Sequence, residues 1–358
     1  MDLPYLFNST KIGPFYLRTH LDSGIPYLVC MGVIMLTGTV GNILVVGAVL
    51  TTKALRTMGN IFILNLAFAD LCVTAIVDPF SIIGFVLGEV YFEDKPALCE
   101  LVACICLTSC FCSLLSIGAI SINRYIHICH HQVYPKIFTF RNTVLITIGL
   151  WVVSFLCEMP NFFGWGDHVY DRKTLSCIYD RLADYSYTLF FTIGGIITPL
   201  VIIAICYLRI YLFVRGSTRK IRDTQEQHMN LPKKGKNDLK FVRTLFIIFL
   251  IFSVCWMPYV IVVLYDKHDR LSSDVHTYVV LLAHINSSMN SVLYGITNRH
   301  FRMAYKRLLC IDKCCKKKRR ISEDNSITNM ATHCPTFLTS MGGSPKGVSY
   351  ANRDELRF

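Results

Sequence analysis

Charged side chains are scarce in this chain of 358 residues. Asp, Glu, Lys and Arg together make up 17% of it, whereas 53% of the residues belong to the hydrophobic set. Soluble domains usually carry about 25% charged residues. The shortage of charge excludes a disordered or collagen-like chain and argues against a soluble enzyme. The chain contains long apolar runs instead.

Seven of these runs are long enough to cross a bilayer as helices, which takes about 20 mostly apolar residues. They cover residues 27–50, 61–87, 101–122, 144–160, 185–214, 245–265 and 275–297. In lipid, a helix satisfies its own backbone hydrogen bonds, whereas an open sheet does not. Core helices of a soluble protein would be shorter and would show polar faces. The sequence therefore predicts an all-α membrane protein, a seven-transmembrane helix bundle over residues 27–297.

The distribution of lysine and arginine predicts the orientation of this bundle. Most of the 36 lie after runs one, three, five and seven, and the richer loops normally stay in the cytosol. We therefore expect a multi-pass protein of the plasma membrane with an extracellular N-terminus (1–26). A short cytosolic amphipathic eighth helix (298–311) and a disordered cytosolic tail (312–358) would follow. The net charge of +12 then faces anionic membrane lipid and cytosolic partners, not nucleic acid.

The two ends of the chain carry candidate modification sites. No basic segment precedes an apolar one at the N-terminus, so the first helix is expected to insert the chain without a cleaved signal peptide. Asn8 begins an Asn-Ser-Thr glycosylation acceptor on the expected outer side. Three cysteines follow the basic segment after the last run and are candidates for palmitoylation; they are Cys310, Cys314 and Cys315. A metal cluster is the alternative there, but no pair of histidines supports it.

One carboxylate lies in the middle of the second run. Asp70 needs polar partners at this depth, because charge within the membrane is costly and commonly functional. Candidates at comparable depth are Asn42, Ser113, Asn286 and Asn290. Carboxylate, amide and hydroxyl oxygens suit a hard cation such as sodium. A protonated Asp70 that simply joins helices is the alternative, whereas Asp78, nearer the outer end, is expected to be solvated.

Two further motifs lie in runs three and six. Asn123-Arg124-Tyr125 ends run three on the cytosolic side, where Arg124 is either a structural ion-pair partner or a movable switch. Pro258 interrupts run six, and proline kinks a helix by removing a backbone hydrogen bond. Trp256, just before it, is placed to sense a ligand and pivot the lower half of the helix.

Together these features resemble the rhodopsin-like class (class A) of G-protein-coupled receptors over about residues 27–309. The residues that carry the resemblance are Gly41-Asn42, Leu66-Ala67-Phe68-Ala69-Asp70, Cys99 with Cys177, Asn123-Arg124-Tyr125, Trp151, Pro199, Tyr207, Cys255-Trp256-Met257-Pro258, Asn290-Ser291-Val292-Leu293-Tyr294 and Phe301-Arg302. Each motif alone is loose, but their order on seven helices is specific.

This resemblance implies a function and a mechanism. An extracellular ligand would shift the bundle between two conformations, and helix six would swing outward about Pro258. Tyr207 and Tyr294 would then meet near Arg124 and hold open a cytosolic cavity for a heterotrimeric G protein. A disulfide between Cys99 and Cys177 is implied as well, and the serine- and threonine-rich tail would bind an arrestin-like protein after phosphorylation.

Two departures from the class pattern point to a subgroup. Members usually have Asp or Glu where Asn123 stands and proline where Ser291 stands. Both departures resemble the melatonin receptors, and the stretch from Asn298 to Arg307 also resembles the invertebrate receptors moody and trapped-in-endoderm. Without an acid beside Arg124, the inactive state is expected to be held less firmly.

The resemblance also suggests which residues bind the ligand: Cys106, Cys110, Asn161, Tyr179, Arg181, Trp256, Tyr259 and His284. Cys106 stands where amine receptors have an aspartate. Asn161 matches an asparagine of the melatonin receptors, whereas their loop glutamine and helix-five histidine correspond to Arg181 and Gly195. Melatonin is therefore doubtful as the ligand. Arg181 either indicates a ligand with an acidic group or is a solvated loop arginine. The ligand could be an indole, a lipid or a peptide.

Other classes of function fit the sequence less well. A seven-helix transporter or channel is the main alternative, but the two halves show no internal repeat. A retinal pigment needs a Schiff-base lysine in helix seven, and residues 275–297 contain none. No enzyme is expected, and no cofactor other than a possible sodium ion.

Overall fold

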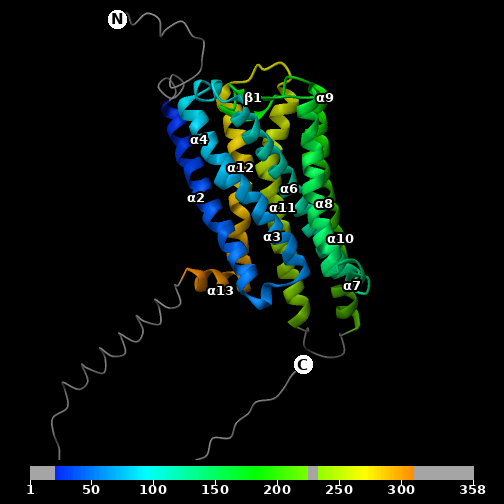
Figure 1. The fold of residues 1–358 in the computed structure, drawn as a ribbon. Helices are drawn as coiled ribbons and strands as arrows, with labels where there is room; N and C mark the ends of the chain where they lie inside the picture. The colour runs from blue at the N-terminus through cyan, green and yellow to red at the C-terminus, as the bar shows by residue number, and fades with distance from the viewer. Residues whose placement is uncertain (1–20, 225–232, 310–358) are drawn as a thin grey trace, which may run out of the picture. The chain divides into compact units, whose positions relative to one another are not determined.

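The computed structural model describes residues 21–224 and 233–309, and helices dominate them (Figure 1). The seven predicted runs lie in α2 (Leu21–Thr51), α3 and α4 (Met58–Cys72 and Asp78–Leu87), α6 (Pro96–Cys129), α8 (Phe140–Glu158), α10 (Thr198–Thr224), α11 (Lys233–Tyr265) and α12 (Ser273–Thr297). Six spans are long and apolar enough to cross a membrane, and α11 adds the apolar stretch Phe249–Tyr265. The helices extend beyond the predicted runs because apolar composition marks only the part of a helix in the lipid core.

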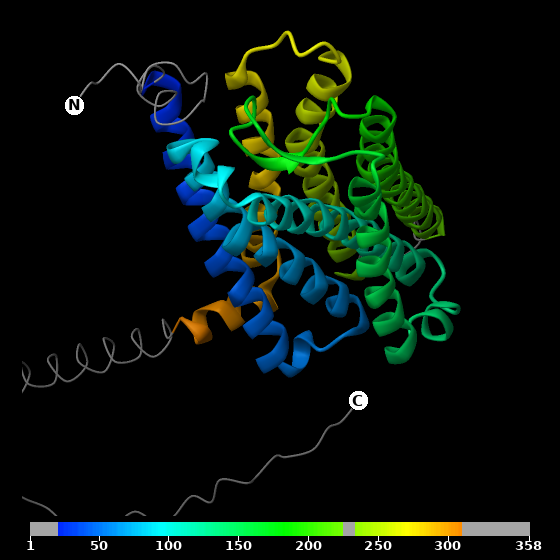
Figure 2. The same ribbon diagram turned by 45° about the horizontal axis from the view of Figure 1, so that its top comes forward.

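Shorter elements complete the bundle at its two ends. They are η2 (Lys53–Leu55), α5 (Val90–Glu93), α7 (Tyr134–Ile137), η4 (Met159–Phe163), β1 (His168–Asp171), β2 (Ser176–Tyr179), α9 (Tyr185–Leu189) and α13 (Arg299–Leu308). Strands β1 and β2 lie across one end, which we call the hairpin end (Figures 1 and 2). The opposite end, where α13 leaves α12, is the α13 end.

The surface of the bundle is apolar, as lipid contact requires. On α2, large aliphatic side chains at helical spacing are exposed: Val29, Val33, Leu36 and Val40. The centre of the bundle is built around α6, whose Leu107, Phe111 and Leu114 are buried in the main apolar core. Apolar groups both inside and outside identify a membrane-embedded bundle rather than a soluble one.

Two helices contain π-helical segments that the sequence analysis did not predict. Segment η3 (Val73–Val77) interrupts helix two, and η5 (Phe190–Ile197) interrupts helix five. Each lies one turn before a proline, Pro79 or Pro199. A proline ring clashes with the carbonyl four residues earlier, and a wider turn relieves the clash. The wider turn also rotates the residues that follow it relative to a regular helix.

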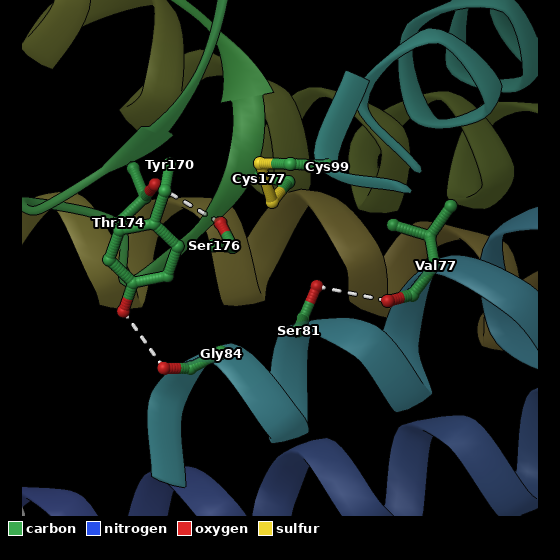
Figure 3. Close-up of a disulfide and its surroundings, with 8 residues drawn as sticks. All are labelled: Val77, Ser81, Gly84, Cys99, Tyr170, Thr174, Ser176 and Cys177. Carbon is green, nitrogen blue, oxygen red and sulfur yellow. Dashed lines mark hydrogen bonds between the residues drawn. A yellow bond between two sulfur atoms is a disulfide. The ribbon is translucent and has the colours of Figure 1, made fainter. Parts of the chain in front are cut away.

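The hairpin is anchored to the bundle by a disulfide and a hydrogen bond (Figure 3). Cys177 of β2 is bonded to Cys99 at the start of α6, with their Cα atoms 5.2 Å apart. The Tyr170 hydroxyl donates to the Gly84 carbonyl at 2.8 Å. The structure thus contains the predicted cystine, while the hairpin itself was not predicted. The anchors hold β2 over the mouth of the bundle.

Helix α13 is the short eighth helix that was predicted at the end of the bundle. Its Phe301 and Ala304 are buried, and the Phe301 ring stacks on Tyr294 of α12 with centroids 5.4 Å apart. Basic residues occupy its other face. The predicted sites at Asn8, Cys310, Cys314 and Cys315 lie outside the described residues.

A polar network joins helices two, three and four inside the bundle. The Trp151 indole N–H donates to Asn65 Oδ1 at 2.8 Å, and Asn65 Nδ2 donates to Ser116 Oγ at 2.8 Å. Asn65 therefore uses its donor and its acceptor to hold two neighbouring helices.

We expect Asn65→Ala to lower the free energy of unfolding by about 1–2 kcal/mol, because it removes two interhelical hydrogen bonds within the membrane. The measurement is thermal unfolding of the purified protein. Trp151→Phe is the matched variant, since it removes one of the two bonds and keeps an aromatic ring beside Phe68. An unchanged midpoint for Asn65→Ala would contradict a stabilising role.

Candidate functional site

A small cavity lies beneath β2 at the hairpin end. Its volume is about 30 Å³, and α6, β2, η5, α11 and α12 contribute to its wall. The lining residues are Cys106, Leu107, Cys110, Ile178, Tyr179, Phe191, Trp256, Tyr259, Val280, Ala283 and His284. Six of the eight predicted ligand-binding residues are among them, namely Cys106, Cys110, Tyr179, Trp256, Tyr259 and His284. The wall is mainly apolar, as in most small-molecule sites.

Two tyrosines close the cavity beneath the hairpin. The hydroxyl groups of Tyr179 and Tyr259 are 3.0 Å apart and share a hydrogen bond. Burial raises the pKa of Tyr179 to about 12, so this phenol stays neutral and can donate. The pair joins β2 to α11 at Tyr259, the residue directly after Pro258. A movement of α11 would therefore displace Tyr259 and change its hydrogen bond to Tyr179, the pair that covers the cavity.

Asn161, the residue that matches the melatonin receptors, lies outside the lining of this cavity. It is buried in η4, and its Nδ2 donates to the Tyr187 hydroxyl at 2.7 Å and to Glu158 Oε2 at 3.1 Å. Glu158 is paired in turn with His168 of β1. These contacts tie the end of helix four to helix five and to the hairpin.

The space near Gly195 explains the second difference from the melatonin receptors. A Cβ atom built on Gly195 would overlap the ring of Phe111 from α6. Phe111 packs on Phe191, with ring centroids 5.0 Å apart. An aromatic side chain from α6 thus fills the volume that a side chain at position 195 would need.

Arg181 is buried and also lies outside the lining of the cavity. Its guanidinium pairs with Asp269, and its Nε lies 3.7 Å from Asp171 Oδ2. Burial alone would lower the pKa of Arg181, but these carboxylates outweigh it and raise that pKa. The interpretation of Arg181 as a solvated loop residue is wrong, because the loop after α11 carries the acid that pairs with it.

The expectation that Asp78 is solvated is also wrong. Asp78 is fully buried, and its Oδ1 lies 2.7 Å from His284 Nδ1. The π-helical segment η3 ends at Val77, and the shift it imposes turns Asp78 toward α12. Helical spacing counted without that segment places Asp78 on a different face.

The predicted polar site around Asp70 is assembled in the middle of the bundle. Asp70 is fully buried. It accepts hydrogen bonds from Ser113 Oγ at 2.8 Å and from Asn290 Nδ2 at 2.9 Å. Asn286 is buried one turn from Asn290 on α12, and Asn42 donates to the Ser287 carbonyl. Helices α6 and α12 thus each bring a polar side chain to the Asp70 carboxylate of α3.

The Asn123-Arg124-Tyr125 motif lies at the α13 end. Asn123 is buried and donates from Nδ2 to the Tyr134 hydroxyl of α7 at 3.3 Å. Arg124 points toward the start of α3, where a Cβ on Gly59 would lie 3.5 Å from its Nη2. Tyr125 is half-buried, and its hydroxyl lies 3.0 Å from His130 Nε2.

The two tyrosines that were predicted to meet near Arg124 have other contacts in this structure. The Tyr207 hydroxyl accepts a hydrogen bond from Ser121 at 3.0 Å. Tyr294 stacks on Phe301 of α13. Both lie at the α13 end, Tyr207 on α10 and Tyr294 on α12.

A seven-helix membrane bundle with a covered cavity at one end and an Asn-Arg-Tyr motif at the other defines a seven-transmembrane receptor. The chain matches the model of the 7 transmembrane receptor (rhodopsin family) over residues 41–294, and it belongs to that family. It is thus a G-protein-coupled receptor and a multi-pass membrane protein. The predicted fold and receptor function are confirmed, and a transporter or channel is not favoured.

Melatonin receptors are among the known proteins to which this chain is similar. It is 30% identical to melatonin receptor type 1B-B of Danio rerio over 86% of this chain and 90% of that protein. It is 32% identical to melatonin receptor type 1B of Homo sapiens over 75% of this chain and 74% of that protein. Squid rhodopsin has the same fold, with a TM-score of 0.70 and 22% identity, over 88% of this chain and 91% of that chain.

Proposed function

We propose that this receptor binds a small, mainly apolar extracellular ligand in the cavity beneath β2. The observation that carries the proposal is the composition of the cavity wall, where Trp256 and Tyr259 lie on either side of Pro258 in α11. The cavity has a volume of only about 30 Å³, so a ligand of indole size must displace the tyrosine cover. Opening of this cover would be the event that moves α11.

In this proposal the hairpin end faces the outside of the plasma membrane and the α13 end faces the cytosol. A G-protein helix docks near Arg124 once α11 has moved, apolar face into groove. Ligand and G protein then raise each other's affinity, because coupling is reciprocal. A sodium ion at Asp70 and an arrestin-like protein at the tail belong to the same proposal. Because Arg181 is already paired, it gives no support to an acidic ligand.

A second-messenger assay in transfected cells tests the ligand proposal. Indoles, acidic lipids and peptides are screened against the natural receptor, and any agonist is then tested on Ala283→Leu, which fills the cavity wall. We expect agonist potency to fall sharply. The matched control is Val292→Leu on the outward face of the same helix. Equal potency on both variants would place the ligand elsewhere.

Melatonin is expected to activate this receptor weakly or not at all. Of the three polar contacts suggested by the resemblance, two are replaced by Arg181 and Gly195, and Asn161 is bonded to Glu158 and Tyr187. The loss of two hydrogen bonds costs about 1–3 kcal/mol, or about 5- to 150-fold in affinity. A dose–response curve measured beside a melatonin receptor checks this. A curve that coincides with the relative's would contradict it.

Basal signalling is expected to fall when the missing acid is restored. Asn123→Asp puts an anion next to Arg124 at a buried position and should favour the inactive state by about 1–3 kcal/mol. The measurement is agonist-free nucleotide exchange on a purified G protein. Asn142→Asp adds the same charge at an exposed site near the α13 end and should have little effect. Unchanged basal nucleotide exchange in Asn123→Asp would argue that an acid beside Arg124 does not stabilise the inactive state.

A further inference from the structure

A second cavity lies at the α13 end of the bundle, where α13 packs against the end of α2 (Figures 1 and 2). Its volume is about 390 Å³, which falls within the usual range of about 300–1,000 Å³ for small-molecule sites. The end of α2 and η2 form one wall, with Thr51 and Ala54, and α13 forms the other, with Met303. Most of the lining residues are exposed, so the cavity opens at the surface of the bundle. The proposed receptor mechanism uses none of these residues.

The ionisable side chains that line this cavity are all basic. Lys53 comes from η2, and His300 and Arg307 come from α13. Neither α13 nor the segment 51–60 contains an acidic residue, and within residues 21–224 and 233–309 no carboxylate forms an ion pair with any of the three. A cleft lined by charge of one sign concentrates ions of the opposite sign. The cavity is therefore suited to an anion.

The position of the cavity indicates the source of that anion. Large apolar side chains are exposed along α2 as far as its last turn, where Leu50 is 56% exposed. Lys53 follows directly after the end of this helix, and basic side chains near helix ends normally extend to the membrane interface. Met303, which lines the cavity, is an exposed apolar residue as well. The cavity thus lies where the apolar surface of the bundle ends and lipid headgroups begin.

We propose that this cavity binds the phosphorylated headgroup of a phosphoinositide in the membrane. A guanidinium donates two parallel hydrogen bonds to a phosphate, and a lysine ammonium adds a point charge. A phosphate monoester carries about 1.5–2 negative charges at neutral pH, so it matches Lys53 and Arg307 better than phosphatidylcholine, which has no net charge. Basic pockets beside membrane helices on the cytosolic side bind headgroups of this kind. The inference rests on the proposed orientation, in which the α13 end faces the cytosol.

A headgroup bound by both walls would hold α13 against the bundle. It would contact Lys53 of η2 and Arg307 of α13 at the same time. Helix α13 also packs on α12, where the Tyr305 hydroxyl donates to the Ser291 carbonyl at 3.2 Å. A ligand that binds only the folded protein stabilises it. The lipid should therefore raise the midpoint of thermal unfolding of the receptor.

The test is native mass spectrometry of the purified full-length receptor in an uncharged detergent, titrated with a short-chain phosphatidylinositol bisphosphate. Lys53→Glu and Arg307→Glu should each lower the affinity at least about 10-fold, the loss expected for a hydrogen bond to a charged group. Lys306→Glu makes the same charge change next to Arg307, at an exposed position outside the cavity lining, and should leave the affinity nearly unchanged. Unchanged affinity in either cavity variant, or an equal loss in Lys306→Glu, would overturn the proposal.

A variant that keeps every charge separates the cavity from a merely basic surface. Ala54 lines the cavity and is exposed, so Ala54→Phe places an aromatic ring in the space that the headgroup would occupy. We expect this variant to weaken binding of the lipid although no cation is lost. Retained affinity in Ala54→Phe would show that the lipid does not enter the cavity.

Two further ligands distinguish a membrane lipid from a soluble anion. Inositol trisphosphate carries monoester phosphates without acyl chains, and phosphatidylcholine carries acyl chains without net charge. The phosphatidylinositol bisphosphate should bind more tightly than inositol trisphosphate, because its chains bury apolar surface as well, and phosphatidylcholine should bind most weakly. Equal binding of inositol trisphosphate would overturn the membrane source, and equal binding of phosphatidylcholine would overturn the recognition of phosphate charge.

Acetylation of the natural receptor gives a measurement that does not depend on variants. The receptor is treated with an amine-reactive acetylating reagent with and without phosphatidylinositol bisphosphate, and each lysine is followed by peptide mass spectrometry. The lipid should slow the acetylation of Lys53 but not that of Lys136, an exposed lysine of α7 at the same end of the bundle. Equal rates at Lys53 with and without the lipid would refute the site. These experiments involve neither signalling nor orientation in a cell, so the lipid site and the proposed receptor function can fail independently.

Discussion

Replacement of Arg124 by alanine is expected to reduce G-protein activation by about 10- to 150-fold while the receptor still reaches the cell surface. The guanidinium lies at the α13 end near Gly59 of α3, where the proposed active state uses it to support the G-protein cavity. Hydrogen bonds to a charged group contribute about 1.5–3 kcal/mol, which corresponds to that range. The substitution destabilises the active state selectively, because the Arg124 hydrogen bonds form only in that state.

The assay is nucleotide exchange on a purified G protein, with and without agonist. Arg141→Ala is the matched control, because it removes an exposed arginine from the start of α8 at the same end. Antibody labelling of an N-terminal tag on intact cells measures surface expression and also tests the proposed orientation. Full G-protein activation by Arg124→Ala would show that Arg124 has no role in the mechanism. A tag reached only after permeabilisation would reverse the proposed topology.

The seven helices could be predicted because the lipid core selects for long apolar runs. Composition alone identifies such runs, and proline, asparagine and arginine within them stand out against that background. The hairpin could not be predicted in this way. Strands β1 and β2 form a short polar connection, held by Cys177 and Tyr170 to residues far away in the sequence.

The cavity residues on helices could be predicted from the sequence, whereas the roles of residues in the connecting segments could not. The family resemblance suggested Cys106, Trp256 and His284, and all three line the cavity. They lie on long regular helices, along which positions carry over between relatives. Asn161 and Arg181 lie in short irregular segments, and each is bonded to groups on other elements, Tyr187 and Asp269. Long-range pairs of this kind leave no signal in a single sequence.

The π-helical segments explain the remaining differences. A regular helix fixes the face of every residue by its number, but η3 shifts that relation between Asp70 and Asp78. Asp70, before the segment, lies near the predicted partners Ser113 and Asn290. Asp78, after it, meets a partner that was assigned to the ligand instead, His284. The wide turn thus lies between Asp70, whose hydrogen-bond partners were predicted, and Asp78, whose partner was not.

Sodium is expected to lower basal nucleotide exchange by at least about fivefold, the lower range of typical allosteric coupling, and Asp70→Asn is expected to abolish this effect. The Asp70 carboxylate faces Ser113 and Asn290 in the middle of the bundle. An amide of the same size keeps the packing but replaces one negatively charged oxygen with an NH₂ group, which repels a cation. A hard cation needs the oxygen ligands, so the variant should no longer distinguish sodium from potassium.

The comparison uses sodium and potassium chloride at equal ionic strength, so that screening is the same in both. Ser113→Ala removes one oxygen and should weaken the sodium effect without abolishing it. If sodium has no effect on the natural receptor while pH does, the protonated form of Asp70 is favoured instead. The sodium-bound and the protonated form of Asp70 differ in what neutralises the carboxylate charge. A bound ion holds three helices around a cation, whereas a proton leaves Asp70 as one more hydrogen-bond partner of Ser113 and Asn290.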